Sequence, residues 1–459
     1  MAYLRLGSDN PNFSFLVRKN PASGMLVKRL RQGTVFGFYS KNNHAQYNCW
    51  FKDHDSAISY NPGEMFEYND TTRYSAALFT NHCCDEFFRD LQLKDLPEDT
   101  AGFNNALLIN CIRAKAKYLE IFSHWFRDFQ WEITPISQGY YRIKLSTNGT
   151  LRRLLCFASV FSLINAIKNG ECDYIDEGLL IKYAKLIQYL EAPYFVRYVF
   201  KVNLVRSEAT FGKLKQYLNT DTIQLQHGHN FLHRMRFIEQ HLDGKTIIDV
   251  GSGEGKYLRF AKNADHYYAI EREESLREII ERKCRRDQRE NVTILESLDE
   301  LPVVDGRKTL ILTEVIEHNP YDEAMALLKR CLLTGCGSHD SPFHSRILIT
   351  TPNRDFNVYY FDDEASGFGL QTSETVAGTE RNEMTGFQPP KPEVRSLKPD
   401  EDADLWLRHE DHHFELTEQE FREFITTATD GVNCNVKFFA VGDKVDGISP
   451  QSGAVIDVM

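Results

Sequence analysis

The sequence predicts an α/β protein in which a doubly wound, parallel sheet in the C-terminal half follows an α+β domain. Two observations predict the sheet: short apolar runs alternate with amphipathic stretches after residue 244, and the first run ends in a glycine-rich turn. Continuous apolar runs are typical of parallel strands that are covered by helices on both faces. The α+β domain is predicted because strand-like and helix-like patterns are mixed throughout residues 1–220.

The N-terminal domain contains a predicted pair of strands followed by two helices. Residues 131–134 and 140–145 form two strand-like runs joined by a polar turn. Residues 150–167 and 176–190 then show helical apolar periodicity. Aromatic clusters such as residues 49–51 are interpreted as core, with stacking on nucleic-acid bases as the alternative.

The C-terminal half alternates predicted strands with predicted helices and starts from a leading helix. The expected strands are residues 246–250, 266–270, 292–295, 308–313 and 346–350. The expected helices are residues 231–242, 255–262, 273–285 and 321–332. Ligands of such sheets bind at the carboxyl ends of the strands, which is where Asp249 and Glu314 lie.

These elements divide the chain into four parts. They are an α+β domain (1–220), a linker with the leading helix (221–243), the doubly wound domain (244–445) and a tail (446–459). Residues 361–404 are rich in Gly, Pro, Ser and Thr and end in an acidic run. This composition predicts a mobile surface insertion, with a lid over the site as the alternative.

The composition is that of an ordinary globular protein. Of 459 residues, 42% are hydrophobic and 26% are charged, which fits two or three folded domains. No apolar run reaches the roughly 18 residues that span a bilayer, and the N-terminus lacks a signal-peptide core, so we expect a cytoplasmic protein without a membrane partner.

Ten cysteines without a C-x-x-C pair indicate reduced thiols. The net charge of -11 argues against coating of nucleic acid, so any such contact must be local.

The glycine-rich turn has the form D-x-G-x-G-x-G, from Asp249 to Gly255. Glycines allow a ligand to approach the backbone, and the following helix start offers unpaired amides. Glu271 closes the next strand about twenty residues later, the spacing at which a carboxylate binds a ribose diol. Asp249 would repel a pyrophosphate, and the x-x-G ending of the dinucleotide fingerprint is missing. The motif therefore favours S-adenosylmethionine over NAD, with a purely structural turn as the alternative.

A second motif, Glu314-Val315-Ile316-Glu317-His318, places two carboxylates and an imidazole within one turn. If a helix begins after Glu314, the side chains at i, i+3 and i+4 lie on one face. More imidazoles follow in the segment Asp411-His412-His413-Phe414-Glu415. Oxygen and nitrogen ligands without cysteine favour Mg, Mn or Fe over a structural zinc. The alternative is a solvated helix face, on which this pattern is also common.

Four motifs together resemble those of the HEN-type methyltransferases, which methylate the 2′-hydroxyl of the 3′-terminal ribose of small RNAs. In chain order they are Asp249–Gly255, Glu314–His318, Thr350–Asn353 with Asn357, and Asp411–Glu415. The resemblance covers about residues 230–445 and implies a Rossmann-like domain that uses S-adenosylmethionine.

Residues 1–220 are similar to the N-terminal region of the bacterial branch of that family. The similarity lies in Phe15–Pro21, Tyr74–Ala77 and the pattern over residues 131–200. In that branch the N-terminal domain associates with a polynucleotide kinase-phosphatase that carries a ligase, and the methyl group protects repaired RNA. The resemblance thus implies two partners, an RNA 3′ end and a kinase-phosphatase-ligase bound through residues 1–220, and no DNA.

The resemblance also implies the roles of individual residues. The metal ligands would be Glu314, Glu317, His318 and His412, with Mn the usual ion and Mg the alternative. The cofactor contacts would be Asp249, Gly251, Ser252, Gly253 and Glu271, with Ser297 near the adenine. His318 and Glu317 would be catalytic, and Asn353 and Arg408 would contact the RNA. Two positions depart from the family, because Leu416 stands where Trp is usual and Glu418 where a basic residue is common.

The expected activity is the metal-dependent transfer of a methyl group from S-adenosylmethionine to the 2′-hydroxyl of an RNA 3′-terminal ribose, in RNA repair or end protection. Two alternatives stay open. One is an O-methyltransferase that acts on a small diol, and the other is an adaptor that activates an RNA ligase through residues 1–220.

Overall fold

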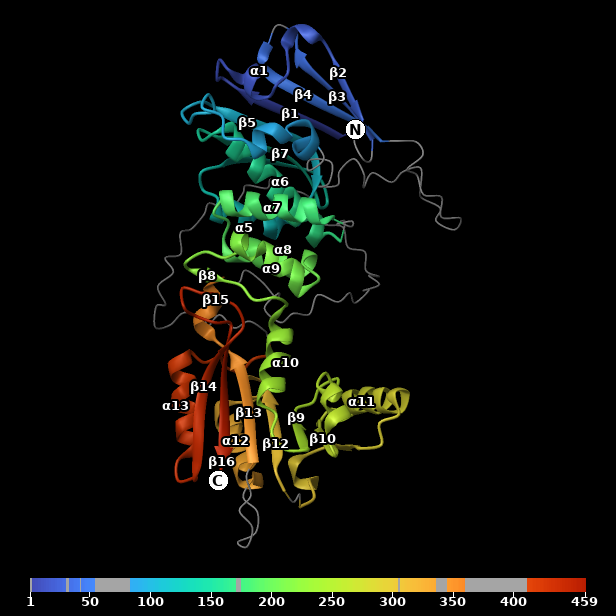
Figure 1. Ribbon diagram of the computed structural model, residues 1–459, viewed down its shortest axis with the longest axis vertical. Coiled ribbons are helices and arrows are strands. Elements are labelled where there is room, and N and C mark those ends of the chain that lie inside the picture. Colours follow the sequence, from blue (N-terminus) through green and yellow to red (C-terminus); the bar gives the residue numbers. More distant parts are fainter. Residues whose placement is uncertain are drawn as a thin grey trace, which may run out of the picture. The chain divides into compact units, whose positions relative to one another are not determined.

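A computed structural model describes most of the chain. The described residues are 2–29, 33–41, 43–53, 83–170, 175–303, 306–335, 345–359 and 411–459. They form two compact units, unit 1 (Met1–Gly228) and unit 2 (His229–Met459) (Figure 1). The predicted insertion at 361–404 lies outside the described residues.

Unit 1 is built on a seven-stranded antiparallel sheet in the order β2-β3-β4-β1-β5-β7-β6. The strands are β1 (Ala2–Ser8), β2 (Leu26–Arg29), β3 (Gly33–Ser40), β4 (Asn43–Asp53), β5 (Asn105–Arg113), β6 (Gln130–Ser137) and β7 (Tyr140–Thr147). A short strand β8 (Ile223–Gln224) follows later. The predicted strand pair is confirmed as β6 and β7, with Trp131 opposite Leu145.

Helices pack on this sheet directly or through one another. The helices of unit 1 are α1 (Phe13–Leu16), α4 (Arg89–Leu93), α5 (Ala116–Trp125), α6 (Leu151–Lys168), α7 (Glu177–Tyr189), α8 (Tyr194–Leu204) and α9 (Glu208–Leu218). Helix α6 contacts β5 and β7, and α7 and α8 pack on α6. The predicted helices at 150–167 and 176–190 are confirmed as α6 and α7, whose first turns are capped by the Thr150 hydroxyl and the Asp176 carboxylate. From α6, the Phe157 ring stacks on Phe129 at a centroid distance of 4.1 Å.

The aromatic cluster at residues 49–51 is only partly core. Cys49 and Phe51 are buried, as predicted, because they point toward the helices. Trp50 alternates to the opposite face of β4, where 37% of its surface is exposed. The prediction that the whole cluster is core is therefore wrong for Trp50.

Unit 2 contains a mixed seven-stranded sheet in the order β11-β10-β9-β12-β13-β16-β14. Its strands are β9 (Thr246–Val250), β10 (His266–Ile270), β11 (Val292–Leu295), β12 (Lys308–Thr313), β13 (Ser345–Pro352), β14 (Cys434–Val441) and β16 (Gln451–Val458), and the short strand β15 (Lys444–Val445) lies outside this sheet. The first five pair in parallel, which confirms the predicted doubly wound core. The prediction of a tail at 446–459 is wrong, because β16 pairs antiparallel with both β13 and β14.

The helices of unit 2 are α10 (Asn230–His241), α11 (Glu274–Asp287), α12 (Tyr321–Gly335) and α13 (Glu418–Thr429). Three of them confirm predicted helices, and α13 begins with a capping box between Thr417 and Glu420. The helix predicted at 255–262 is instead the 3₁₀ turn Leu258–Asn263, because Gly251, Gly253 and Gly255 hold the chain in left-handed conformations before it.

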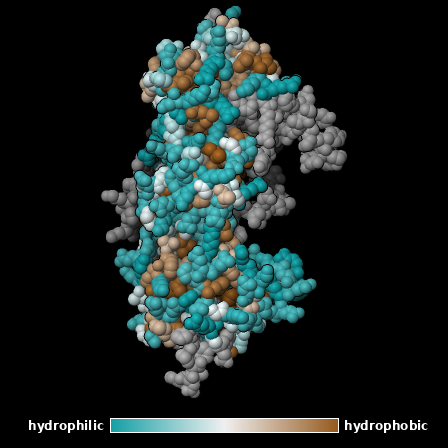
Figure 2. Space-filling model, in the orientation of Figure 1, coloured by the Kyte–Doolittle hydropathy of each residue, from teal (hydrophilic) through white to brown (hydrophobic). Residues whose placement is uncertain are grey.

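The visible surface of both units is largely hydrophilic, with hydrophobic patches between polar regions (Figure 2). Within the residues that the structure describes, no helix combines the length and the apolar character that crossing a membrane requires.

Candidate functional site

The glycine-rich turn lies directly after β9, at the carboxyl edge of the parallel strands. Gly251 has a φ of 71°, and a Cβ atom there would lie 2.8 Å from a methyl group of Val315. Gly253 has a φ of 53° and no heavy atom of the protein near the position of a Cβ. The turn therefore needs glycine for its conformation, and at Gly253 it leaves open space in which a ligand can approach the backbone.

Glu271 and Ser252 join the glycine turn to the end of β10. The Gly253 amide donates to one carboxylate oxygen of Glu271 at 2.8 Å, and the Glu273 amide donates to the other at 3.0 Å. The Ser252 hydroxyl donates to the carbonyl oxygen of Ile270 at 3.1 Å. A carboxylate offers about four lone-pair directions, so Glu271 keeps acceptor capacity for a ribose diol while it holds the turn.

Asp249 lies inside the protein rather than on the surface of the site. Its carboxylate is buried and accepts a hydrogen bond of 2.6 Å from the Tyr267 hydroxyl. Burial raises the pKa of Asp249 to about 7, and the nearby Glu271 adds to this rise. Asp249 thus lies buried at the end of β9, just before the glycine turn. With a pKa of about 7, a large fraction of its carboxyl groups carry a proton at neutral pH.

Replacing Asp249 with asparagine should change how stability depends on pH. In the folded protein the carboxyl keeps its proton up to about pH 7, whereas in the unfolded chain it loses the proton near pH 4. Stability of the wild type is therefore lost as pH rises through this window, and the Asp249→Asn variant escapes that loss. Urea unfolding should show the variant gaining, relative to wild type, up to about 4 kcal/mol between pH 4 and pH 8. An equal difference at both pH values would contradict the raised pKa.

Three candidate metal ligands lie close together beside the glycine-rich turn that follows β9. Glu317 and His318 lie in the 3₁₀ turn Ile316–His318, which follows β12. His412 lies in the segment 411–415, which is fixed to that turn by the His413 amide donating to the Glu317 carbonyl oxygen at 2.8 Å. One ligand atom from each of Glu317, His318 and His412 lies within 4.8 Å of the others. The prediction that His412, and not His413, points to this cluster agrees with burial of His412 and exposure of His413.

The electrostatics of the cluster suit a divalent cation. Glu317 is fully buried, and burial together with Glu314 raises its pKa well above the ordinary value. Thr351 donates to one of its carboxylate oxygens at 3.2 Å, while the other oxygen has no hydrogen-bond partner among the described residues. Burial and the adjacent His412 lower the pKa of His318, so that its ring is neutral. A buried carboxylate with an unsatisfied oxygen, beside the neutral ring of His318, is a donor set that such a cation would satisfy.

Buried and exposed carboxylates hold both imidazoles in place. The Nδ1 atom of His412 lies 2.7 Å from the buried carboxylate of Glu415, which also accepts a hydrogen bond of 2.6 Å from Asn357. The Nδ1 atom of His318 lies 3.1 Å from Asp411. In each ring a carboxylate thus lies at the Nδ1 atom, and such a contact is typical of histidines that bind metals.

Glu314 does not join the three-residue cluster. Its φ is 55°, and the residues after it form a 3₁₀ turn, so the predicted helical face that would align Glu314, Glu317 and His318 is wrong. The Glu314 carboxylate instead pairs with the buried guanidinium of Arg234 at 3.0 Å. It also accepts hydrogen bonds of 3.2 Å from both Gln451 and Thr350.

The remaining predicted residues occupy different places. Ser297 is half-buried at the start of the turn after β11, at the carboxyl edge of the sheet. Asn353 is buried, and its amide donates to the Ser449 carbonyl oxygen at 3.0 Å, so it holds a loop and does not present itself to RNA. Arg408 lies outside the described residues. Leu416 is buried in the core, and the exposed Glu418 pairs with Arg422 at 2.8 Å.

Sequence reasoning missed Arg234 and Tyr267, which hold Glu314 and Asp249. Neither has a local signal, because each is distant in sequence from the carboxylate that it contacts. Glu415 could have been found, since it lies three residues after His412 in the segment that was singled out.

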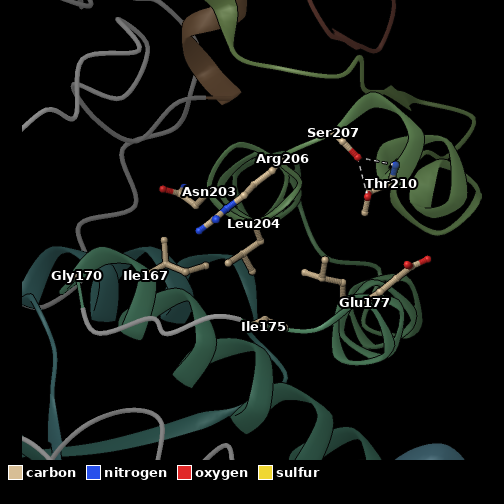
Figure 3. A pocket seen from close by; sticks show the side chains of 10 residues that line it. Ile167, Gly170, Ile175, Glu177, Asn203, Leu204, Arg206, Ser207 and Thr210 are labelled. Atoms are coloured by element: carbon tan, nitrogen blue, oxygen red, sulfur yellow. Dashed lines mark hydrogen bonds between the residues drawn. The ribbon is translucent and has the colours of Figure 1, made fainter. Parts of the chain in front are cut away.

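Unit 1 contains a separate pocket that the structure does not connect with this chemistry (Figure 3). Its apolar lining includes Ile167, Leu180 and Leu204. Two of its polar lining residues are already engaged, because the Ser207 hydroxyl caps α9 and Glu177 pairs with Lys213. The candidate active site is therefore the cluster in unit 2.

Comparison with known proteins gives a match for the N-terminal half of the chain. Residues 3–223 match the family model described as the Hen1 N-terminal domain. A chain in a solved structure of the Pnkp1/Rnl/Hen1 RNA repair complex is 24% identical, with a TM-score of 0.74 over 99% of this chain and 100% of that one. A second structure of the Pnkp1/Rnl/Hen1 complex gives the same identity and TM-score over 100% of both chains. At this identity the structures show a shared fold. No curated protein matches.

Proposed function

Since residues 3–223 form a Hen1 N-terminal domain, we propose that this chain is a methyltransferase of RNA ends that works together with RNA repair enzymes. The proposed reaction transfers a methyl group from S-adenosylmethionine to the 2′-hydroxyl of an RNA 3′-terminal ribose. The observation that carries it is the cluster of Glu317, His318 and His412 beside the glycine turn after β9.

The chain offers separate contacts for the donor and for the acceptor. The glycine turn and Glu271, at the ends of β9 and β10, would hold the adenosyl and methionine parts of the donor. Glu317, His318 and His412 would hold a divalent cation, Mn or Mg, which supplies a Lewis acid that lowers the pKa of a bound ribose hydroxyl. A cation held by these three residues would favour a terminal ribose, which offers two vicinal hydroxyls, over an internal ribose, which has only one free hydroxyl.

The residues around the cluster have positioning roles. Glu415 and Asp411 orient the rings of His412 and His318, so that one nitrogen of each faces the cation. The lowered pKa of His318 keeps its ring neutral, which binding of a cation requires. The proton of the ribose hydroxyl would pass to a neighbouring carboxylate, because both nitrogens of the His318 ring would be engaged.

The N-terminal domain supports a partner role beside the catalytic one. The solved structures that share the fold of the whole chain are of a complex named Pnkp1/Rnl/Hen1. We propose that residues 1–220 bind a kinase-phosphatase and ligase of that kind, so that methylation of the terminal ribose precedes ligation of the same RNA end. The methyl group would then protect the mended site from a second cut.

The test is an assay with three short RNAs that differ only at the 3′ end. The ends are a vicinal diol, a 2′-deoxyribose and a 3′-phosphate, each supplied with labelled S-adenosylmethionine and Mn. Only the diol RNA should take up label, and its end should then resist periodate oxidation. Equal labelling of all three ends, or labelling of small diols in preference to RNA, would reject the proposed substrate.

A further inference from the structure

The seven-stranded sheet of unit 1 has a second face, opposite to the helices. Direct cross-strand pairs place side chains on the same face, so one row runs from Val27 through Phe36 and Trp50 to Tyr3, across β2, β3, β4 and β1. Trp50 is 37% exposed and Val27 is 53% exposed, and the Phe36 and Trp50 rings lie 5.4 Å apart. At about 4.8 Å between strands, the row is about 14 Å long.

Basic side chains flank this row on both sides. On one side, Arg29 of β2 and Lys52 of β4 both pair with Thr34 of β3. On the other side, Arg5 of β1 pairs with Leu108 of β5, two positions along the strands from Tyr3. Within the part of the chain that the structure describes, none of these three cations forms an ion pair.

The one acidic side chain that the pairings place on the same face is already neutralised. Glu132 of β6 stands opposite Lys144 of β7, and the two form an ion pair of 2.6 Å. Arg142 of β7 lies on this face as well, next to that pair in the strand. Among the described residues, the face therefore presents the exposed ring of Trp50 and the half-buried rings of Tyr3 and Phe36, framed by unbalanced positive charge.

The charge of the whole chain hides this local excess. Residues 1–228 contain 27 Lys and Arg against 22 Asp and Glu, so the first half is basic although the chain carries a net charge of -11. The acidic excess belongs to residues 229–459. A negatively charged partner would therefore be attracted to unit 1 and repelled by the average charge of unit 2.

We propose that this face, made of Tyr3, Phe36 and Trp50 with Arg5, Arg29 and Lys52, binds single-stranded RNA. Exposed rings on a sheet stack on unpaired bases, and flanking cations bind the phosphates that connect those bases. A row of this length accommodates two or three stacked bases. The contact is independent of the 2′-hydroxyl chemistry in unit 2 and serves to hold the RNA away from its end.

The charge of the face favours RNA over a protein partner. Interfaces between proteins are also enriched in Tyr, Trp, Phe and Arg, so the rings alone fit either partner. Here the cations lie on both sides of the rings and form no ion pair with any acidic side chain that the structure describes, which suits a chain of phosphates. A paired duplex would hide its bases from the rings, so the ligand is single-stranded.

The experiment measures binding of a fluorescent twelve-nucleotide oligouridine with a 3′-phosphate to the full-length chain, in EDTA and without a methyl donor. Trp50→Ala should weaken binding roughly 5- to 100-fold, and Trp50→Phe should restore most of the affinity because it keeps a ring. Arg29→Gln and Lys52→Gln should each reduce the slope of log K against log salt by about 0.7.

A matched control is Lys215→Gln, which removes the same charge from the exposed surface of α9 and should change neither affinity nor slope. Wild-type affinity in Trp50→Ala would overturn the proposal. The proposal would also be overturned if the variants of Trp50, Arg29 and Lys52 kept their affinity for RNA but no longer copurified with a kinase-phosphatase-ligase. That result would show that the face binds a protein. Since this RNA has no terminal diol, failure here is distinguishable from failure of the methylation assay.

Discussion

Replacing Glu317 with glutamine should abolish metal-dependent methylation and leave the fold as stable as before, or more stable. The carboxylate is fully buried, and its pKa is raised well above the ordinary value by burial and by Glu314. Glutamine has the same shape as the protonated acid, so it removes the cost of a buried negative charge. It also removes the charged ligand, and the loss of activity should exceed the roughly 10- to 100-fold effect of losing an outer-shell partner.

Two measurements separate the metal role from a structural one. Titration of Mn into the wild type should raise its melting temperature, because the ion binds the folded state only, whereas Glu317→Gln should show no such rise. Glu423→Gln, a change of the same chemistry on the exposed side of α13, serves as the control. Retention of the Mn-dependent rise in Glu317→Gln would remove Glu317 from the ligand set.

Replacing Arg234 with methionine should cause the largest loss of stability. The guanidinium is buried and pairs with Glu314 at 3.0 Å, and it also lowers the pKa of Glu317. Without it, two carboxylates share a buried site that has no compensating cation. Removing one partner of a buried ion pair costs about 3–5 kcal/mol, which urea unfolding measured without metal would detect.

The matched control for this variant is Arg422→Met. Its partner, Glu418, is exposed, and both groups lie on the surface of α13. Exposed pairs of this kind contribute about 0–1 kcal/mol, so the control should unfold close to the wild type. If Arg234→Met and Arg422→Met lost equally little stability, the Arg234–Glu314 pair would not be holding the site together.

The parallel strands of unit 2 could be predicted to within one or two residues because both faces of each strand are buried. Continuous apolar runs such as 246–250 and 308–313 have no other common explanation in a globular protein. β16 escaped prediction because Gln451, Ser452 and Gly453 have the composition of a loop. They are buried in the sheet, where a Cβ on Gly453 would lie 3.0 Å from Val441.

The candidate site could be predicted only as far as its local segments. The sequence indicates that Glu317, His318 and His412 are chemically suitable, and the carboxyl edge of the sheet gives them a meeting place. It could not indicate that Glu314 would turn to Arg234, because that contact depends on how α10 packs, some 80 residues earlier in the chain. An ion pair between residues that are far apart in the sequence leaves no periodic pattern, so the sequence alone does not reveal it.

The position of β16 between β13 and β14 constrains how unit 2 folds during synthesis. β13 pairs with a strand about a hundred residues later, so its edge stays open until residues 451–458 have left the ribosome. Gln451, at the start of that strand, donates a hydrogen bond to Glu314 beside the candidate metal cluster. A nascent chain that stalls before this point carries an unpaired apolar edge and an unfinished candidate site, so we expect it to be prone to aggregation.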